Sequence, residues 1–85
     1  MTSSLDDRRK KLLYQATYRG FKEADLLIGG FAKAHLANLT DSELDEFEAL
    51  LHLNDHDLYN WATGKVERPD DIDGPVFKKL QAFKL

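Results

Sequence analysis

The sequence contains no cysteine, little valine or isoleucine, and no excess of positive charge. Without cysteine the chain has no disulfide framework, no thiolate zinc site and no cysteine nucleophile. Its formal net charge is −3 at pH 7, so the overall basic character of a nucleic-acid-binding domain is missing. Only two valines and two isoleucines occur, and no segment alternates as a strand does. These absences favour an all-α protein of a reducing compartment that binds no nucleic acid.

Long apolar runs are also absent. No stretch approaches the roughly 20 residues that a membrane-spanning helix needs. The segment MTSSLDDRRKKLL at the start of the chain places acids before its basic run, which differs from a secretory signal peptide. We therefore expect a soluble, cytoplasmic protein without membrane insertion. Its 85 residues predict a single domain, residues 1–85, and we expect it to be a monomer.

Helical periodicity predicts a compact bundle of five short helices. The first is expected over about residues 5–17, with Ser3 or Ser4 as its cap, and the second over about residues 20–36. The third begins with the sequence TDSE, which predicts a capping box between Thr40 and Glu43.

The last two helices have their own boundary signals. Asp55 is expected to cap the fourth helix, and Gly64 to end it in a left-handed conformation. The fifth begins around Pro75, which is tolerated in a first turn. A charged loop, KVERPDDID, separates these two helices.

Apolar residues at helical spacing define the expected core. They are Leu12, Leu13, Ala16, Ala24, Leu27, Ile28, Phe31, Ala34, Leu44, Phe47, Leu50, Leu51, Leu58, Trp61, Val76, Leu80 and Phe83. Gly29 and Gly30 interrupt the second helix and together cost roughly 2 kcal/mol of helix propensity. Either the helix bends there, or a neighbouring element packs very close.

Two clusters of polar residues have both a functional and a structural interpretation. His52 and His56 have the spacing of two metal ligands on one helix face, but a turn falls between them and no third ligand is marked. Surface histidines are the favoured interpretation, and no metal is expected. The basic run at residues 8–11 stands beside two aspartates in an acidic chain, which favours a solvated helix face over phosphate binding. No catalytic motif is present, so we expect a protein that is not an enzyme.

The stretch YRGFKEADLLIGGFA is unusual in local terms. With a helix starting near Gly20, Arg19 opposes the helix dipole, and an Arg–Glu pair with Glu23 has the weaker i,i+4 orientation. A surface ion pair explains Glu23 but leaves Arg19 and Gly20 unexplained. An arrangement that local helix energetics disfavour, and that brings no local stabilisation, points to a functional role. We expect Gly20 to admit a partner closely, a side chain there to be tolerated by the fold, and Arg19 and Glu23 to clamp the partner.

At these residues the sequence resembles the small succinate dehydrogenase assembly factors, the SdhE-like proteins. Their R-G-x-x-E hallmark stands here as Arg19-Gly20-Phe21-Lys22-Glu23, followed by the acidic Asp25. Their second marker, D-x-D-L-x-x-W, stands as DHDLYNW at residues 55–61. A helix like LTDSELDEFEALL lies between the two, so the resemblance covers nearly the whole chain.

The resemblance implies a five-helix bundle that binds the flavoprotein subunit of succinate dehydrogenase and promotes covalent attachment of its FAD, with the flavoprotein subunit of a related fumarate reductase as a further candidate partner. No tightly bound cofactor is expected, because the FAD belongs to the partner. The expected partner-binding residues are Arg19, Gly20, Glu23, Asp25, Asp57 and an exposed Tyr59. The alternative is a regulatory protein–protein adaptor, antitoxin-like or cytoskeleton-binding, that uses the same surface.

Overall fold

The computed structural model describes residues 4–83, which form five α-helices and one 3₁₀ turn without any strand. In chain order they are α1 (Ser4–Thr17), α2 (Lys22–His35), η1 (Leu36–Asn38), α3 (Asp41–Leu51), α4 (Asp55–Thr63) and α5 (Pro75–Ala82). The predicted all-α fold with five helices is therefore confirmed. A cap on the first helix by Ser3 was one expectation, and that residue lies outside the described range. No helix within residues 4–83 is both long enough and apolar enough to cross a membrane.

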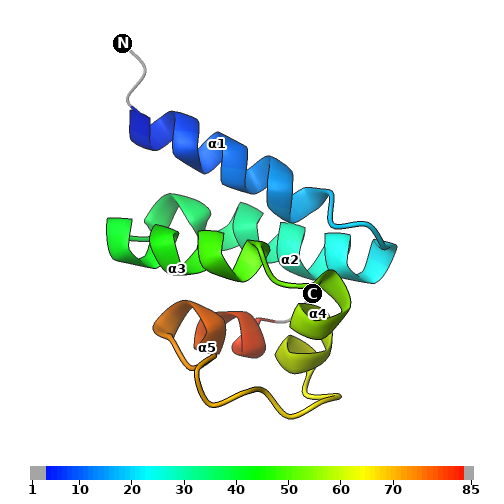
Figure 1. Cartoon of the computed structure of the whole chain (residues 1–85). Helices are drawn as coiled ribbons and strands as arrows, with labels where there is room; N and C mark the ends of the chain where they lie inside the picture. Colours follow the sequence, from blue (N-terminus) through cyan, green and yellow to red (C-terminus); the bar gives the residue numbers. More distant parts are fainter. Residues whose placement is uncertain (1–3, 84–85) are drawn as a thin grey trace.

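The first two helices form a close antiparallel pair. Figure 1 shows α1 lying across one side of α2 and α3, while α4 and α5 lie on the other side. The glycine pair is part of this arrangement, because α2 continues unbroken through it. A Cβ added to Gly29 would lie 3.1 Å from the Cα of Thr17 in α1. At Gly29, close approach of a neighbouring helix is therefore the explanation that the structure supports.

Three phenylalanine rings, from α2, α3 and α5, fill the centre of the bundle. Phe31, Phe47 and Phe77 are essentially inaccessible to solvent, and the first two have ring centroids 5.8 Å apart. Most of the predicted core is confirmed. The buried members are Leu12, Ala16, Ala24, Leu27, Ile28, Phe31, Leu44, Phe47, Leu50, Leu51, Leu58, Val76 and Leu80, with Leu13 and Phe83 partly buried.

Two predicted core residues lie on the flanks of their helices, and Phe77 was missed. In α2 the buried stripe passes through Ala32, so Ala34 faces solvent. In α4 the buried positions are Leu58 and Ala62, spaced i,i+4, which leaves Trp61 only partly buried. Trp61 therefore packs against the core without being fully buried, as Leu13 and Phe83 do.

The helix ends follow the predicted chemistry with one exception. Thr40 and Glu43 form the capping box, and Gly64 adopts φ 79° at the end of α4. The side chain that caps α4 belongs to Asn54, whose oxygen accepts hydrogen bonds from the backbone N–H of His56 and Asp57. The prediction of Asp55 as the cap was therefore wrong, and its carboxylate is left available for another contact.

The basic run on α1 also departs from a purely solvated face. Arg8 bonds the carboxylate of Asp45 on α3 at 2.6 Å. Arg9 donates to the carbonyl oxygens of Leu36 and Leu39, at the ends of the 3₁₀ turn. These two arginines attach α1 to its neighbours, while Lys10 and the residue after it are exposed.

Candidate functional site

The R-G-x-x-E residues begin in the loop between α1 and α2. Helix α2 starts at Lys22, two residues later than predicted, so Arg19 and Gly20 precede it. The dipole penalty inferred for Arg19 within a first turn therefore does not arise. The side chain of Asp25 accepts a hydrogen bond from the backbone N–H of Arg19, which ties the loop to the first turn of α2.

The side chain of Arg19 points into the protein and is only 8% exposed to solvent. Its Nη2 lies 2.6 Å from Oδ1 of Asp55 and donates to the carbonyl oxygen of Leu51 at 2.7 Å. Within residues 4–83, no ion pair joins Arg19 to Glu23. The arginine charge is paired with Asp55 on α4, and the expected clamp of Arg19 and Glu23 around a partner stays a prediction.

Gly20 has a backbone conformation that strongly favours glycine. Its φ is +121°, and a Cβ at this position would lie 3.2 Å from Oδ2 of Asp55. L-amino acids with side chains rarely adopt this conformation. The expectation that the fold would tolerate a side chain at Gly20 is therefore wrong.

An aromatic cluster connects the loop to α4. The ring of Phe21 stacks on His56 with centroids 4.3 Å apart, and meets the edge of Tyr59 at 5.4 Å. Tyr59 is partly buried in consequence, not exposed as expected, whereas Asp57 is exposed. The roles of Phe21 and His56 were not predicted. An apolar residue directly before a helix was the only local signal for the first of them.

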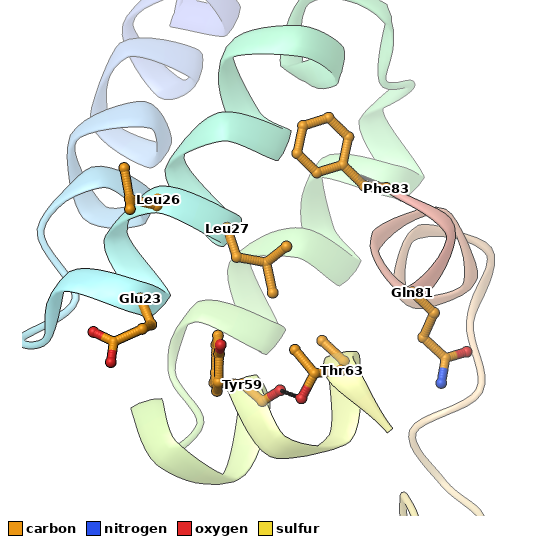
Figure 2. Close-up of a pocket in the computed structure, with 8 residues that line it drawn as sticks. Glu23, Leu26, Leu27, Tyr59, Thr63, Gln81 and Phe83 are labelled. Atoms are coloured by element: carbon orange, nitrogen blue, oxygen red, sulfur yellow. Dashed lines mark hydrogen bonds between the residues drawn. The ribbon is translucent and has the colours of Figure 1, made fainter. Parts of the chain in front are cut away.

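Beside this cluster a groove of about 330 Å³ opens between α2, α4 and the C-terminal end of α5. Its lining residues are Glu23, Leu26, Leu27, Tyr59, Ala62, Thr63, Gln81 and Phe83 (Figure 2). Glu23 is exposed, and Leu26 is 52% exposed, which is high for a leucine. An exposed carboxylate beside apolar side chains suits a protein partner that carries both charge and apolar groups.

Two exposed aromatic residues lie near the end of α1 and at the start of the loop. Tyr14 and Tyr18 are 67% and 68% exposed, and their ring centroids are 4.7 Å apart. Tyrosine is enriched at protein interfaces because it presents apolar area and a polar end.

Metal ligation was one interpretation of the histidines. His52 follows the end of α3 and lies 4.0 Å from Glu48, while His56 belongs to α4 and stacks on Phe21. Among residues 4–83 there is no group of three side chains placed to hold a metal ion.

Comparison with known proteins adds independent information. The protein family described as "Flavinator of succinate dehydrogenase" matches residues 10–84. A Candida glabrata protein named "Succinate dehydrogenase assembly factor 2, mitochondrial" is 40% identical over 98% of the chain and 57% of its own length. Proteins of the same name from Dictyostelium discoideum and Meyerozyma guilliermondii are 42% and 48% identical, over 93% and 89% of the chain and 56% and 59% of their own lengths. The chain thus spans between half and three fifths of these relatives.

Proposed function

The chain belongs to the flavinator family of succinate dehydrogenase, and from this premise we propose that it binds the flavoprotein subunit of that enzyme and promotes covalent attachment of FAD to it. The resemblance inferred from the R-G-x-x-E hallmark is thereby confirmed at the level of the family. The relatives are named as mitochondrial. The expected cytoplasmic location of this chain stays a prediction.

One observation supports the proposal most directly: the two family markers, 36 residues apart in sequence, meet in space. Asp55 of the second marker touches both the Arg19 side chain and the position of a Cβ on Gly20. Glu23, four residues after Arg19, lines a groove together with Tyr59, and Asp57, two residues after Asp55, is exposed. The fold thus brings Arg19, Gly20 and Asp55 into contact, and Asp25 ties the loop to α2.

The proposed contribution is positional. Holding two reacting groups in the correct geometry can account for a large part of a rate increase without any new reacting group. Glu23 and Asp57 offer charged acceptors to the partner's basic or N–H groups. The groove offers an apolar surface to a partner side chain. In this proposal the FAD and the residue to which it attaches belong to the flavoprotein subunit, and this chain acts as a chaperone and not as an enzyme.

Co-expression with the flavoprotein subunit, in cells that lack an assembly factor of their own, tests the proposal. Covalent flavin is read as fluorescence of that subunit in a denaturing gel, and binding as co-purification with the tagged chain. We expect both signals with the chain present and neither in its absence. Equal fluorescence with and without the chain would overturn the proposal. Recovery of unrelated proteins in place of the flavoprotein would favour the regulatory-adaptor alternative.

A further inference from the structure

We propose that Arg19 and Asp55 form an internal latch that holds residues 20–23 in the shape that the partner recognises. Both are then positioning residues, and neither needs to touch the partner. The inference rests on the proposed function, and it concerns how the surface is maintained. It assigns a role to Asp55 and gives Arg19 a role other than the contact expected from sequence.

The first support is where Arg19 places its charge. Its Nη2 reaches the carbonyl oxygen of Leu51, the last residue of α3, and a second carbonyl at Leu53. Carbonyl groups at a helix C-terminus carry partial negative charge and lack partners within the helix. No basic residue occurs in the last turn of α3. The α1–α2 loop therefore supplies the cation that this helix end lacks.

The second support is the double contact of one carboxylate. Oδ1 of Asp55 pairs with Arg19, and Oδ2 lies 3.2 Å from the position of a Cβ on Gly20. Because Asn54 caps α4, the Asp55 carboxylate is free to make these contacts. A side chain at Gly20 would press against the same group that Arg19 needs.

The third support is the cost of leaving the arginine unpaired. Within the described residues, its Nε is buried and has no hydrogen-bond partner. The guanidinium is therefore only partly compensated by its present contacts, and its charge depends on Asp55. Removing one member of a buried charged pair leaves the other desolvated and uncompensated.

The backbone of residues 19–23 connects the Arg19–Asp55 pair to the exposed surface. With Arg19 fixed, its backbone N–H bonds Asp25, and Gly20 turns the chain at φ +121°. Phe21 then stacks on His56, and Glu23 follows on the rim of the groove. Loss of the latch should free this segment and so weaken binding from a distance.

Hydrogen–deuterium exchange and binding, measured on the full chain, test the latch. The variants are Arg19→Met, Arg19→Lys and Asp55→Asn. The matched controls are Arg8→Met and Asp45→Asn, which break another Arg–Asp pair with the same 2.6 Å distance. In the free protein we expect Arg19→Met and Asp55→Asn to raise exchange of the backbone amides at positions 19 and 25 by tenfold or more. Affinity for the purified flavoprotein subunit should fall by at least tenfold, and the controls should change neither quantity.

Two further measurements separate a latch from a direct contact. The double variant Arg19→Met with Asp55→Asn should bind about as weakly as either single variant, because both remove the same interaction. Arg19→Lys keeps a charge that can reach Asp55, and should restore part of the affinity lost in Arg19→Met. Far-UV circular dichroism identifies any variant that fails to fold. If Arg19→Met does not fold, exchange and affinity are compared between Arg19→Lys and wild type.

The outcomes are distinct. Lower affinity with unchanged exchange in the free protein, or additive losses in the double variant, would show that Arg19 and Asp55 touch the partner and would overturn the latch. Unchanged affinity in a folded Asp55→Asn variant would also overturn it. If the wild-type chain fails to bind the flavoprotein, the proposed function itself is wrong, and with it the role of the latch in recognition.

Discussion

The carboxylate of Glu46 occupies the space that a side chain at Gly74 would need. From α3 it accepts hydrogen bonds from the backbone N–H groups of Val76 and Phe77, at 3.1 and 2.9 Å. A Cβ on Gly74 would collide with this carboxylate. The N-terminus of α5 is thus capped by a residue from another helix, because Gly74 has no side chain to do so.

We expect Glu46→Ala to lower the free energy of unfolding by about 1 to 2 kcal/mol, since it leaves two N–H groups at a helix start without their acceptor. Gly74→Ala should cost a similar amount by displacing the same carboxylate. In the Glu46→Ala background, Gly74→Ala should cost almost nothing, because no carboxylate remains to displace. Urea denaturation of the four proteins in this cycle measures the coupling. Additive losses would mean that the two residues act independently.

The helix pairing gives a second prediction. Gly29→Ala should destabilise the protein by about 1 to 3 kcal/mol, although alanine is the better helix former. Its Cβ would press on the backbone of Thr17, which cannot move as a flexible side chain can. Lys33→Ala, at an exposed position of the same helix, should change stability by less than about 0.5 kcal/mol. A thermal melt of Gly29→Ala above that of wild type would contradict the close packing of α1 and α2.

The sequence predicted most of the fold because the relevant signals are local. The capping box of Thr40 and Glu43 lies within four residues, and the left-handed Gly64 follows from the end of an amphipathic stretch. Leu44 and its partners on α3 repeat at helical spacing, and all of them are buried. Such features need no knowledge of what packs against the helix.

The candidate site was only partly predictable because its central contact is distant in sequence. Local reasoning offered Glu23 as the partner of Arg19, whereas Asp55 is the residue that pairs with it. Two neighbouring residues, Asn54 and Asp55, are both good helix caps. Asn54 caps α4, and Asp55 pairs with Arg19 of the α1–α2 loop. The local sequence around residues 54 and 55 does not show that this arginine lies beside them.

The position of Trp61 on α4 gives a third prediction. It lies three residues after Leu58, whereas the buried positions of this helix are Leu58 and Ala62. Because the ring is partly exposed, we expect Trp61→Ala to cost about 1 to 2 kcal/mol, less than the 3 to 5 kcal/mol of a fully buried tryptophan. Leu58→Ala, at a fully buried position on the same helix, should cost about 2 to 5 kcal/mol. Chemical denaturation ranks the two variants. A greater loss for Trp61→Ala would place the indole in the core.

Acid should weaken the start of α3. The hydrogen bond from the backbone N–H of Thr40, and next the side-chain bond from Lys79, hold the pKa of Glu43 below its ordinary value of 4.5. The folded state therefore favours the charged carboxylate. Its contribution to stability is fully present above about pH 4.5, and is lost as the pH falls through the lower pKa of the folded state.

The measurement is the difference in melting temperature between wild type and Glu43→Gln across pH. The wild type should be the more stable protein near pH 7, and the difference should shrink as the pH falls below 4.5. A difference that stays constant down to the most acidic pH at which the protein folds would show that the charge of Glu43 contributes nothing.

Glu23 gives the sharpest test of the exposed surface. Its carboxylate lies on the rim of the groove (Figure 2), and within residues 4–83 it forms no ion pair. Glu23→Gln keeps the size of the side chain and removes its charge. We expect the free energy of unfolding to change by less than about 1 kcal/mol, because an exposed acid in a first turn contributes little.

Binding should respond far more strongly. If the carboxylate meets a desolvated cation or N–H group of the flavoprotein, its loss should cost roughly 2 to 5 kcal/mol of affinity. Covalent flavin on the partner should fall with it, measured as fluorescence in a denaturing gel. Asp41→Asn is the matched control, since Asp41 is an exposed acid in the first turn of α3. Equal flavin attachment with Glu23→Gln, Asp41→Asn and wild type would remove Glu23 from the partner surface. A fall with both variants would point to the overall charge of the chain and not to this surface.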